Sequence, residues 1–123
     1  MKHSEGFLKL VDDAKSRVRE VSVGDTQQRM RENTHAKLID VREDKEWEAA
    51  HAAGAIHLGK GIIERDIETT VPDKNTELIL YCGGGYRSAL AGDALQRMGY
   101  TNVFSMAGGW KAWQEEGGEV ESS

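Results

Sequence analysis

One run of five residues, Glu77 to Tyr81 (ELILY), constrains the fold more than any other part of this chain. The run is apolar almost throughout, as expected for a short strand that is buried on both of its faces. Three glycines follow directly after Cys82, and a helical pattern of apolar residues then extends from Arg87 to Met98. A buried strand, a tight loop and a helix in immediate succession are typical of a parallel sheet covered by helices.

The rest of the chain continues this alternation of helices and strands. We expect further strands at 37–41, 55–58 and 103–106, and helical segments at about 5–19, 25–32, 44–49, 62–67 and 110–116. Asp25 or Thr26 is expected to cap the second of these helices, and Asp44 the third. The pattern predicts an α/β fold with a largely parallel sheet that carries helices on both faces.

Composition narrows the class of protein. The 123 residues fit one domain, and the apolar runs are too short to span a bilayer. The net charge of −5 argues against nucleic acid as the main partner. The single cysteine, Cys82, excludes an internal disulfide, and the four histidines lack metal-ligand spacing. We therefore expect a cytoplasmic protein with no metal site, because a lone thiol suits a reducing compartment.

The loop after the best strand carries the residues most suited to chemistry. It reads Cys82-Gly83-Gly84-Gly85-Tyr86-Arg87-Ser88. Glycines let the backbone approach a bound group closely, and successive N–H groups in such a loop form an anion-binding nest. The positive end of the following helix and the charge of Arg87 favour the thiolate, which is the nucleophilic form of cysteine. We predict that Cys82 is a catalytic nucleophile and that residues 83–88 bind an anionic substrate.

The spacing within this loop separates two classes of cysteine enzyme. Cysteine phosphatases place five residues between the nucleophile and the arginine that cradles phosphate. Here four residues separate Cys82 from Arg87, and Ser88 occupies the position of a phosphatase arginine. The shorter ring suits a single sulfur atom better than a phosphoryl group, so a cysteine phosphatase or arsenate reductase is the less favoured alternative.

Four landmarks along residues 21–116 resemble those of the rhodanese homology domain. They are Leu38 to Glu43 (LIDVRE), Glu46-Trp47 with His51, Gly54 and Ala55, the Cys82 loop, and Gly108-Gly109-Trp110 with Ala112-Trp113. The chain departs from the family pattern at Ala50, where glycine is usual, and at Ala52-Ala53, where Ile-Pro is usual. These departures lie in a structural loop, and the nucleophile itself is present.

The resemblance implies a five-stranded, mainly parallel sheet and a sulfurtransferase without metal or organic cofactor. The implied mechanism moves a sulfane sulfur from thiosulfate or a persulfide donor onto Cys82, and from there to cyanide or a thiol. A sulfur carrier that serves a relay between proteins remains an alternative to a freely turning-over enzyme. The expected division is an N-terminal helical extension over 1–20, the rhodanese domain over 21–117 and a flexible tail over 118–123.

Four further polar residues are candidates for supporting roles. Asp40 is expected to pair with an arginine or to accept backbone N–H bonds, and Arg42 to pair with Glu46 at i,i+4 spacing. Lys60 and Arg65 belong to a glycine-flanked, charged stretch, where they would either steer an anionic donor or form a solvated turn.

Overall fold

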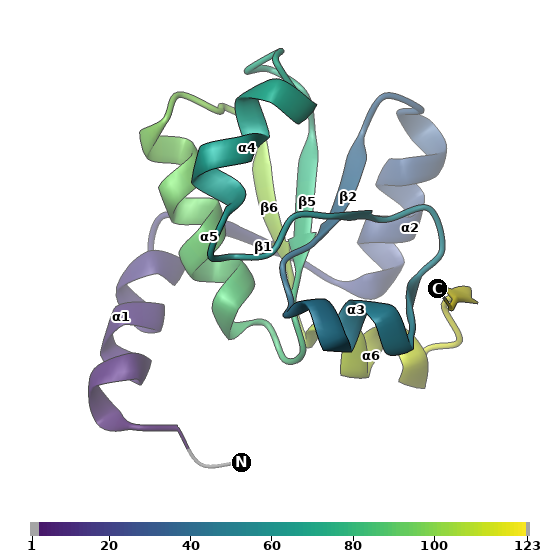
Figure 1. Ribbon diagram of the computed structural model, residues 1–123, viewed down its shortest axis with the longest axis horizontal. Helices are drawn as coiled ribbons and strands as arrows, with labels where there is room; N and C mark the ends of the chain where they lie inside the picture. Colours follow the sequence, from purple (N-terminus) through teal and green to yellow (C-terminus); the bar gives the residue numbers. More distant parts are fainter. Residues whose placement is uncertain (1–2, 123) are drawn as a thin grey trace.

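The computed structural model describes residues 3–122, and helices alternate with strands along most of this range (Figure 1). In chain order the elements are α1 (Glu5–Lys15), β1 (Arg19–Val21), α2 (Val23–Glu32), β2 (Lys37–Asp40), α3 (Asp44–Ala49), β3 (His51–Ala52), β4 (Ile56–His57), α4 (Ile63–Thr70), β5 (Leu78–Tyr81), α5 (Tyr86–Arg97), β6 (Val103–Met106), α6 (Gly109–Glu115) and β7 (Val120–Glu121).

The main sheet of residues 3–122 has five strands in the order β1-β6-β5-β2-β4, and every neighbouring pair is parallel. The predicted α/β class and the mainly parallel five-stranded sheet are therefore confirmed. The order puts β5 in the centre of the sheet. Cys82 follows the last residue of β5 and lies at the carboxyl edge, where open parallel sheets bind their ligands.

Helices cover both faces of this sheet, which explains why the central strand is apolar throughout. Leu78, Leu80 and Cys82 point into a core formed with α4 and α5. Ile79 and Tyr81 point into the opposite core, which contains residues of α2 and α6. Figure 1 shows α4 and α5 on one side of the sheet and α2 on the other. Because successive strand residues alternate between faces, burial on both sides requires an unbroken apolar run.

The N-terminal helix ends earlier than its sequence predicts. Residues 5–19 were expected to be helical, but α1 stops at Lys15 and Arg19–Val21 forms β1 at the edge of the sheet, beside β6. Two of the three β1 residues are exposed, so the strand lacks the apolar pattern that would reveal it. Met1 and Lys2 of the expected extension lie outside the described residues.

Two expected helix caps are wrong. Ser22, rather than Asp25 or Thr26, caps α2, because its side-chain oxygen accepts the backbone N–H of Asp25 (3.0 Å). Glu43, rather than Asp44, is the N-cap of α3. The observed N-cap lies three or four residues before the predicted one in α2 and one residue before it in α3.

The segment expected as a flexible tail contains secondary structure. Val120–Glu121 forms β7, which pairs antiparallel with β3. The carbonyl oxygen of Glu119 accepts hydrogen bonds from Trp113 Nε1 (2.8 Å) and from the Ala53 N–H (2.9 Å). These bonds attach residues 118–122 to α6 and to the turn after β3, whereas Ser123 lies outside the described residues.

Candidate active site

The loop from β5 to α5 wraps around the sulfur of Cys82. Gly85 has φ +98, a value in the left-handed region that glycine adopts without strain. This turn directs the Gly85 N–H at Cys82 Sγ, at 3.1 Å. Tyr86 then begins α5, so the sulfur lies close to the amino end of a long helix. Both features favour negative charge on the sulfur.

Two buried serines continue the polar contacts of Cys82. Ser88 Oγ lies 3.5 Å from Cys82 Sγ and 2.7 Å from Ser105 Oγ. Both hydroxyls are fully buried, so their orientations are limited to this short chain of polar atoms. Ser88 was predicted as part of the loop, but Ser105 was not. A lone serine inside the apolar strand β6 was the only sequence signal for it.

The start of α6 fixes the position of the same loop. The Trp110 N–H donates to the Cys82 carbonyl oxygen (2.7 Å), and the Lys111 N–H donates to the Gly83 carbonyl oxygen (3.2 Å). Gly109 sits at this contact with φ +52. The start of α6 therefore holds the Cys82 loop in place through these two backbone hydrogen bonds. This gives the Gly-Gly-Trp landmark of the sequence a structural role.

Arg87 forms an ion pair with Glu46 beside the loop. Its Nη1 and Nη2 atoms donate to the two carboxylate oxygens at 2.8 and 3.2 Å. The predicted pair of Arg42 with Glu46 is wrong, because Glu46 faces Arg87 across 41 residues of sequence. These hydrogen bonds hold the pKa of Glu46 below its ordinary value. They are also the main cause of a raised pKa of Arg87, to which the nearby Cys82 contributes in the same direction.

Asp40 and Arg42 form a buried pair at the end of β2, where Asp40 is the register partner of Tyr81 on β5. Arg42 Nη2 and Nε donate to Asp40 Oδ2 at 2.8 and 3.1 Å, and the two side chains are 3% and 0% exposed. Arg42 also donates to the Ala50 carbonyl oxygen at 2.7 Å. The expectation that Asp40 pairs with an arginine is confirmed. This pair ties the end of β2 to the segment after α3.

Lys60 and Arg65 are both exposed and do not line the cavity beside Cys82. The Arg65 guanidinium pairs with its neighbour Asp66 at 2.7 and 2.9 Å. The structure thus places Arg65 on the exposed surface of α4 rather than in a turn. Steering of an anionic donor by these two cations stays a prediction.

A cavity of ≈ 410 Å³ opens beside Cys82. Its lining comes from two parts of the chain: Cys82, Gly84, Tyr86 and Arg87 of the loop, and His3 and Phe7 at the start of the chain. The sequence did not predict the contribution of the N-terminal residues. Phe7 lies within the segment 5–19 that was expected to be helical, but a helical pattern does not say where the helix docks.

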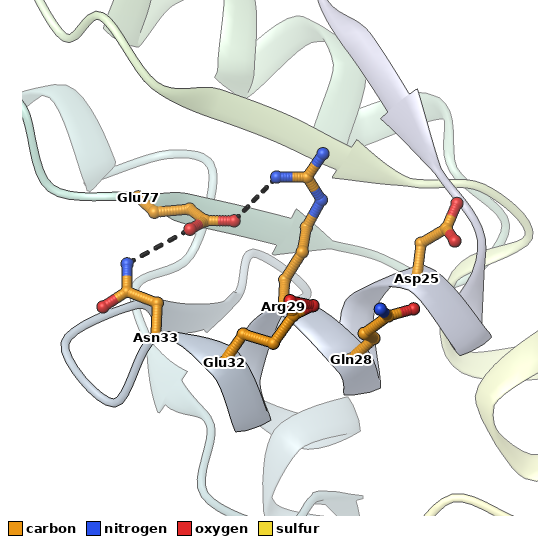
Figure 2. Close-up of a pocket in the computed structure, with 6 residues that line it drawn as sticks. All are labelled: Asp25, Gln28, Arg29, Glu32, Asn33 and Glu77. Carbon is orange, nitrogen blue, oxygen red and sulfur yellow. Dashed lines mark hydrogen bonds and ion pairs between the residues drawn. The ribbon is translucent and has the colours of Figure 1, made fainter.

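A second cavity of ≈ 460 Å³ lies at the opposite end of the central strand, because Glu77 precedes β5 whereas Cys82 follows it. Figure 2 shows Glu77 between Arg29 and Asn33, which donate to its two oxygens at 2.9 and 3.1 Å. The other residues that line this second cavity are Asp25, Gln28 and Glu32. Both carboxylate oxygens of Glu77 have hydrogen-bond partners. The polar residues of this cavity are therefore explained by structural pairing between α2 and the residue before β5.

Residues 3–122 contain no group of three His, Cys, Asp or Glu side chains arranged to hold a metal ion. Over the same range, no helix combines the length and apolar character needed to cross a membrane.

Three features define the family to which this domain belongs: the parallel sheet, the glycine loop around Cys82 and the α6 turn that supports this loop. The chain belongs to the family of rhodanese-like domains, whose family model matches residues 22–116. Thiosulfate sulfurtransferase PspE of Escherichia coli is 41% identical over 73 residues, which cover 59% of this chain and 69% of that protein. A putative sulfur carrier protein of Bacillus subtilis, YrkF, is 28% identical over 80% of this chain and 52% of its own length.

Solved structures extend the similarity to the N-terminal helix. The polysulfide-sulfur transferase homodimer of Wolinella succinogenes aligns with a TM-score of 0.82 and 27% identity, covering 96% of this chain and 88% of that one. A Rhodopseudomonas palustris protein described as a possible tyrosine phosphatase aligns with a TM-score of 0.86 and 25% identity, covering 98% of each chain.

Proposed function

We propose that this chain is a sulfurtransferase that moves a sulfane sulfur from thiosulfate or a persulfide donor to cyanide or a thiol through a persulfide on Cys82. The observation that carries the proposal is the hydrogen bond from the Gly85 N–H to Cys82 Sγ at the floor of a cavity that Arg87 also lines. This arrangement supplies an activated sulfur nucleophile and a cation for an anionic donor.

The proposed reaction has two steps. The Cys82 thiolate attacks the outer sulfur of thiosulfate, a new S–S bond forms, and sulfite leaves with the electron pair of the broken S–S bond. In the second step, cyanide attacks the outer sulfur of the persulfide, and thiocyanate leaves as the Cys82 thiolate is restored. The Gly85 N–H and the Ser88 hydroxyl lie where they stabilise the anionic sulfur before and after transfer.

The related proteins support this proposal at the level of chemistry. Their names describe thiosulfate sulfurtransfer, sulfur carriage and polysulfide-sulfur transfer. We propose that the partners of this chain are a small anionic sulfur donor and a cyanide or thiol acceptor, with a sulfur-relay protein as the alternative acceptor. A cytoplasmic setting fits a functional thiol, because reducing compartments keep it free.

Intact-mass measurement tests the persulfide directly. Wild-type protein incubated with thiosulfate is expected to gain one sulfur atom, about 32 Da, and a reducing thiol should remove it. Peptide mapping should place the added mass on Cys82. A mass that stays unchanged with thiosulfate and with other sulfane-sulfur donors would contradict the proposal.

Replacing Arg87 with alanine is expected to lower kcat/KM for thiosulfate about 10- to 100-fold, the usual scale of a charge-assisted contact to an anion. Arg87→Lys should restore part of the lost kcat/KM, because it keeps the positive charge but not the bidentate hydrogen bonding of the guanidinium. Alkylation of Cys82 should shift to higher pH in Arg87→Ala, because a nearby cation favours the thiolate.

Glu46→Gln is the matched control for Arg87, because it removes the ion pair but keeps the guanidinium. It should leave the alkylation profile closer to wild type than Arg87→Ala does. If alkylation and thiosulfate kinetics of Arg87→Ala both match wild type, then Arg87 serves only its ion pair with Glu46.

A cysteine phosphatase is the second candidate, since one structural neighbour is described as a possible tyrosine phosphatase. We expect negligible hydrolysis of aryl phosphates, because only four residues separate Cys82 from Arg87 and the ring is short for a phosphoryl group. Release of p-nitrophenol from p-nitrophenyl phosphate measures this activity. Robust turnover that disappears in Cys82→Ser would reverse the ranking of the two functions.

A further inference from the structure

A serine hydroxyl is buried in the apolar core behind Cys82. Ser105 lies on β6, and its register partner on β5 is Leu80, which comes two residues before Cys82. The neighbours of Ser105, Phe104 and Met106, point into the core with α2 and α6, so Ser105 points to the opposite side, toward α5. Its side chain is 0% exposed. A buried hydroxyl is costly unless it forms a hydrogen bond, so this position requires a polar partner.

The partner is the hydroxyl of Ser88 on α5. Ser105 Oγ lies 2.7 Å from Ser88 Oγ, and Ser88 Oγ lies 3.5 Å from Cys82 Sγ. Within residues 3–122, the Ser105 side chain forms no other hydrogen bond, and the Ser88 side chain forms these two. The three side chains therefore make a row of polar atoms that starts at the sulfur and ends inside the core. We call Ser88 and Ser105 the serine pair.

The closed end of this row fixes the direction of its hydrogen bonds. A thiolate can only accept hydrogen bonds, whereas each serine hydroxyl has one hydrogen to donate. If Ser88 donated to Ser105, the Ser105 hydrogen would have no acceptor among the described residues. If Ser105 donates to Ser88, then Ser88 donates to Cys82 Sγ, and both hydrogens have acceptors. Negative charge on the sulfur is therefore the state that satisfies the whole row.

The serine pair reaches the sulfur from the interior of the domain. Neither serine lines the cavity, where the titratable or charged side chains beside Cys82 are His3, Tyr86 and Arg87. Both serines are fully buried. A substrate in the cavity meets the sulfur without touching the pair, so the pair acts on the reaction only through Cys82.

We propose that Ser105 is a positioning residue whose hydroxyl donates to Ser88 and thereby holds the Ser88 hydroxyl as a donor to the anionic sulfur of Cys82. The proposal rests on the sulfurtransferase function proposed above. Without Ser105, the Ser88 hydroxyl is free to donate to a carbonyl of its own helix, as serines within helices do. Hydrogen bonds in a row also polarise one another, so the bond from Ser105 strengthens the bond from Ser88 to the sulfur.

Ser105→Ala removes the end of the row and changes no residue that lines the cavity. The midpoint of the pH profile of Cys82 alkylation by iodoacetamide should rise by about half a unit to one unit, because the thiolate loses part of its stabilisation. The kcat/KM for thiosulfate below that midpoint should fall about three- to tenfold, the same loss expressed as the fraction of thiolate. Ser105→Thr keeps the hydroxyl and should restore part of both. Cys82 is the only cysteine, so alkylation reports this one thiol.

A double-mutant cycle separates the positioning role from a structural one. Ser88→Ala removes the donor to the sulfur itself and should shift the alkylation profile further than Ser105→Ala does. If Ser105 acts through Ser88, then Ser105→Ala should cause no additional shift in the Ser88→Ala background. A structural effect of alanine on β6 would instead add to the effect of Ser88→Ala.

Thr26→Val is the matched control for the loss of a buried hydroxyl. Thr26 lies on α2, is also 0% exposed, and donates its hydroxyl hydrogen to the Ser22 carbonyl oxygen at 2.8 Å. The change removes one buried hydrogen bond but none in the row that ends at Cys82. Its alkylation profile should match that of wild type.

The outcomes separate the inference from the function on which it rests. Equal alkylation profiles in wild type and Ser105→Ala, or a shift of the same size with and without Ser88, would overturn the positioning role and leave the sulfurtransferase intact. A shift in Thr26→Val as large as that in Ser105→Ala would assign the effect to lost stability and would also overturn it. If wild type forms no persulfide from any sulfane-sulfur donor, the proposed function is overturned, and the alkylation profiles still decide whether Ser105 stabilises the thiolate.

Discussion

Cys82→Ser is expected to lower thiocyanate formation from thiosulfate and cyanide by at least about a thousandfold, the scale of losing a catalytic nucleophile. Serine cannot hold a persulfide, and Cys82 is the only cysteine in the chain. The measurement is the rate of thiocyanate release under saturating cyanide. Substantial activity in the variant would remove the central claim about the mechanism.

The same variant should keep its fold. Serine is close to cysteine in volume, and its hydroxyl can accept the Gly85 N–H that now reaches Cys82 Sγ at 3.1 Å. We expect the free energy of unfolding to fall by no more than about 1–3 kcal/mol, the usual cost of burying a hydroxyl, because the Gly85 N–H gives this hydroxyl a hydrogen-bond partner. Denaturant unfolding of both proteins therefore separates loss of the nucleophile from loss of structure.

Gly109→Ala is expected to lower the free energy of unfolding by about 2–4 kcal/mol and to reduce sulfur transfer. Gly109 has φ +52, which disfavours any residue with a Cβ atom. An added Cβ would overlap the Cys82 carbonyl oxygen and lie 2.9 Å from the carbonyl carbon and oxygen of Gly83. Relief of this overlap requires the α6 turn to move away from the loop that holds Cys82.

Gly117→Ala separates backbone strain from overlap. Gly117 has φ +74, but no atom outside its chain neighbours lies within 4 Å of an added Cβ. This control should lose only about 1–2 kcal/mol, the cost of the left-handed conformation. If denaturant unfolding gives the two variants equal stability, the contact of Gly109 with the Cys82 loop is not a constraint on the site.

The sequence alone determined the class of fold and the position of Cys82, the proposed nucleophile, in its loop. Both depend on local patterns, because a strand buried on two faces needs a continuous apolar run and a tight turn at its end needs glycine. Cys82 and the residues after it are contiguous in the chain, so their proximity in the loop required no knowledge of distant contacts.

Tertiary structure decided which distant residues surround that loop. Glu46 reaches Arg87, and Ser105 reaches Ser88, across 41 and 17 residues, and no local periodicity encodes such pairs. The short strands β1 and β7 were hidden for a related reason. Each has two exposed residues, and so short a segment forms a strand only when a neighbouring strand supplies hydrogen bonds. The docking of α1 likewise depends on the surface of α5, because a helical pattern defines an apolar face but not the partner that covers it.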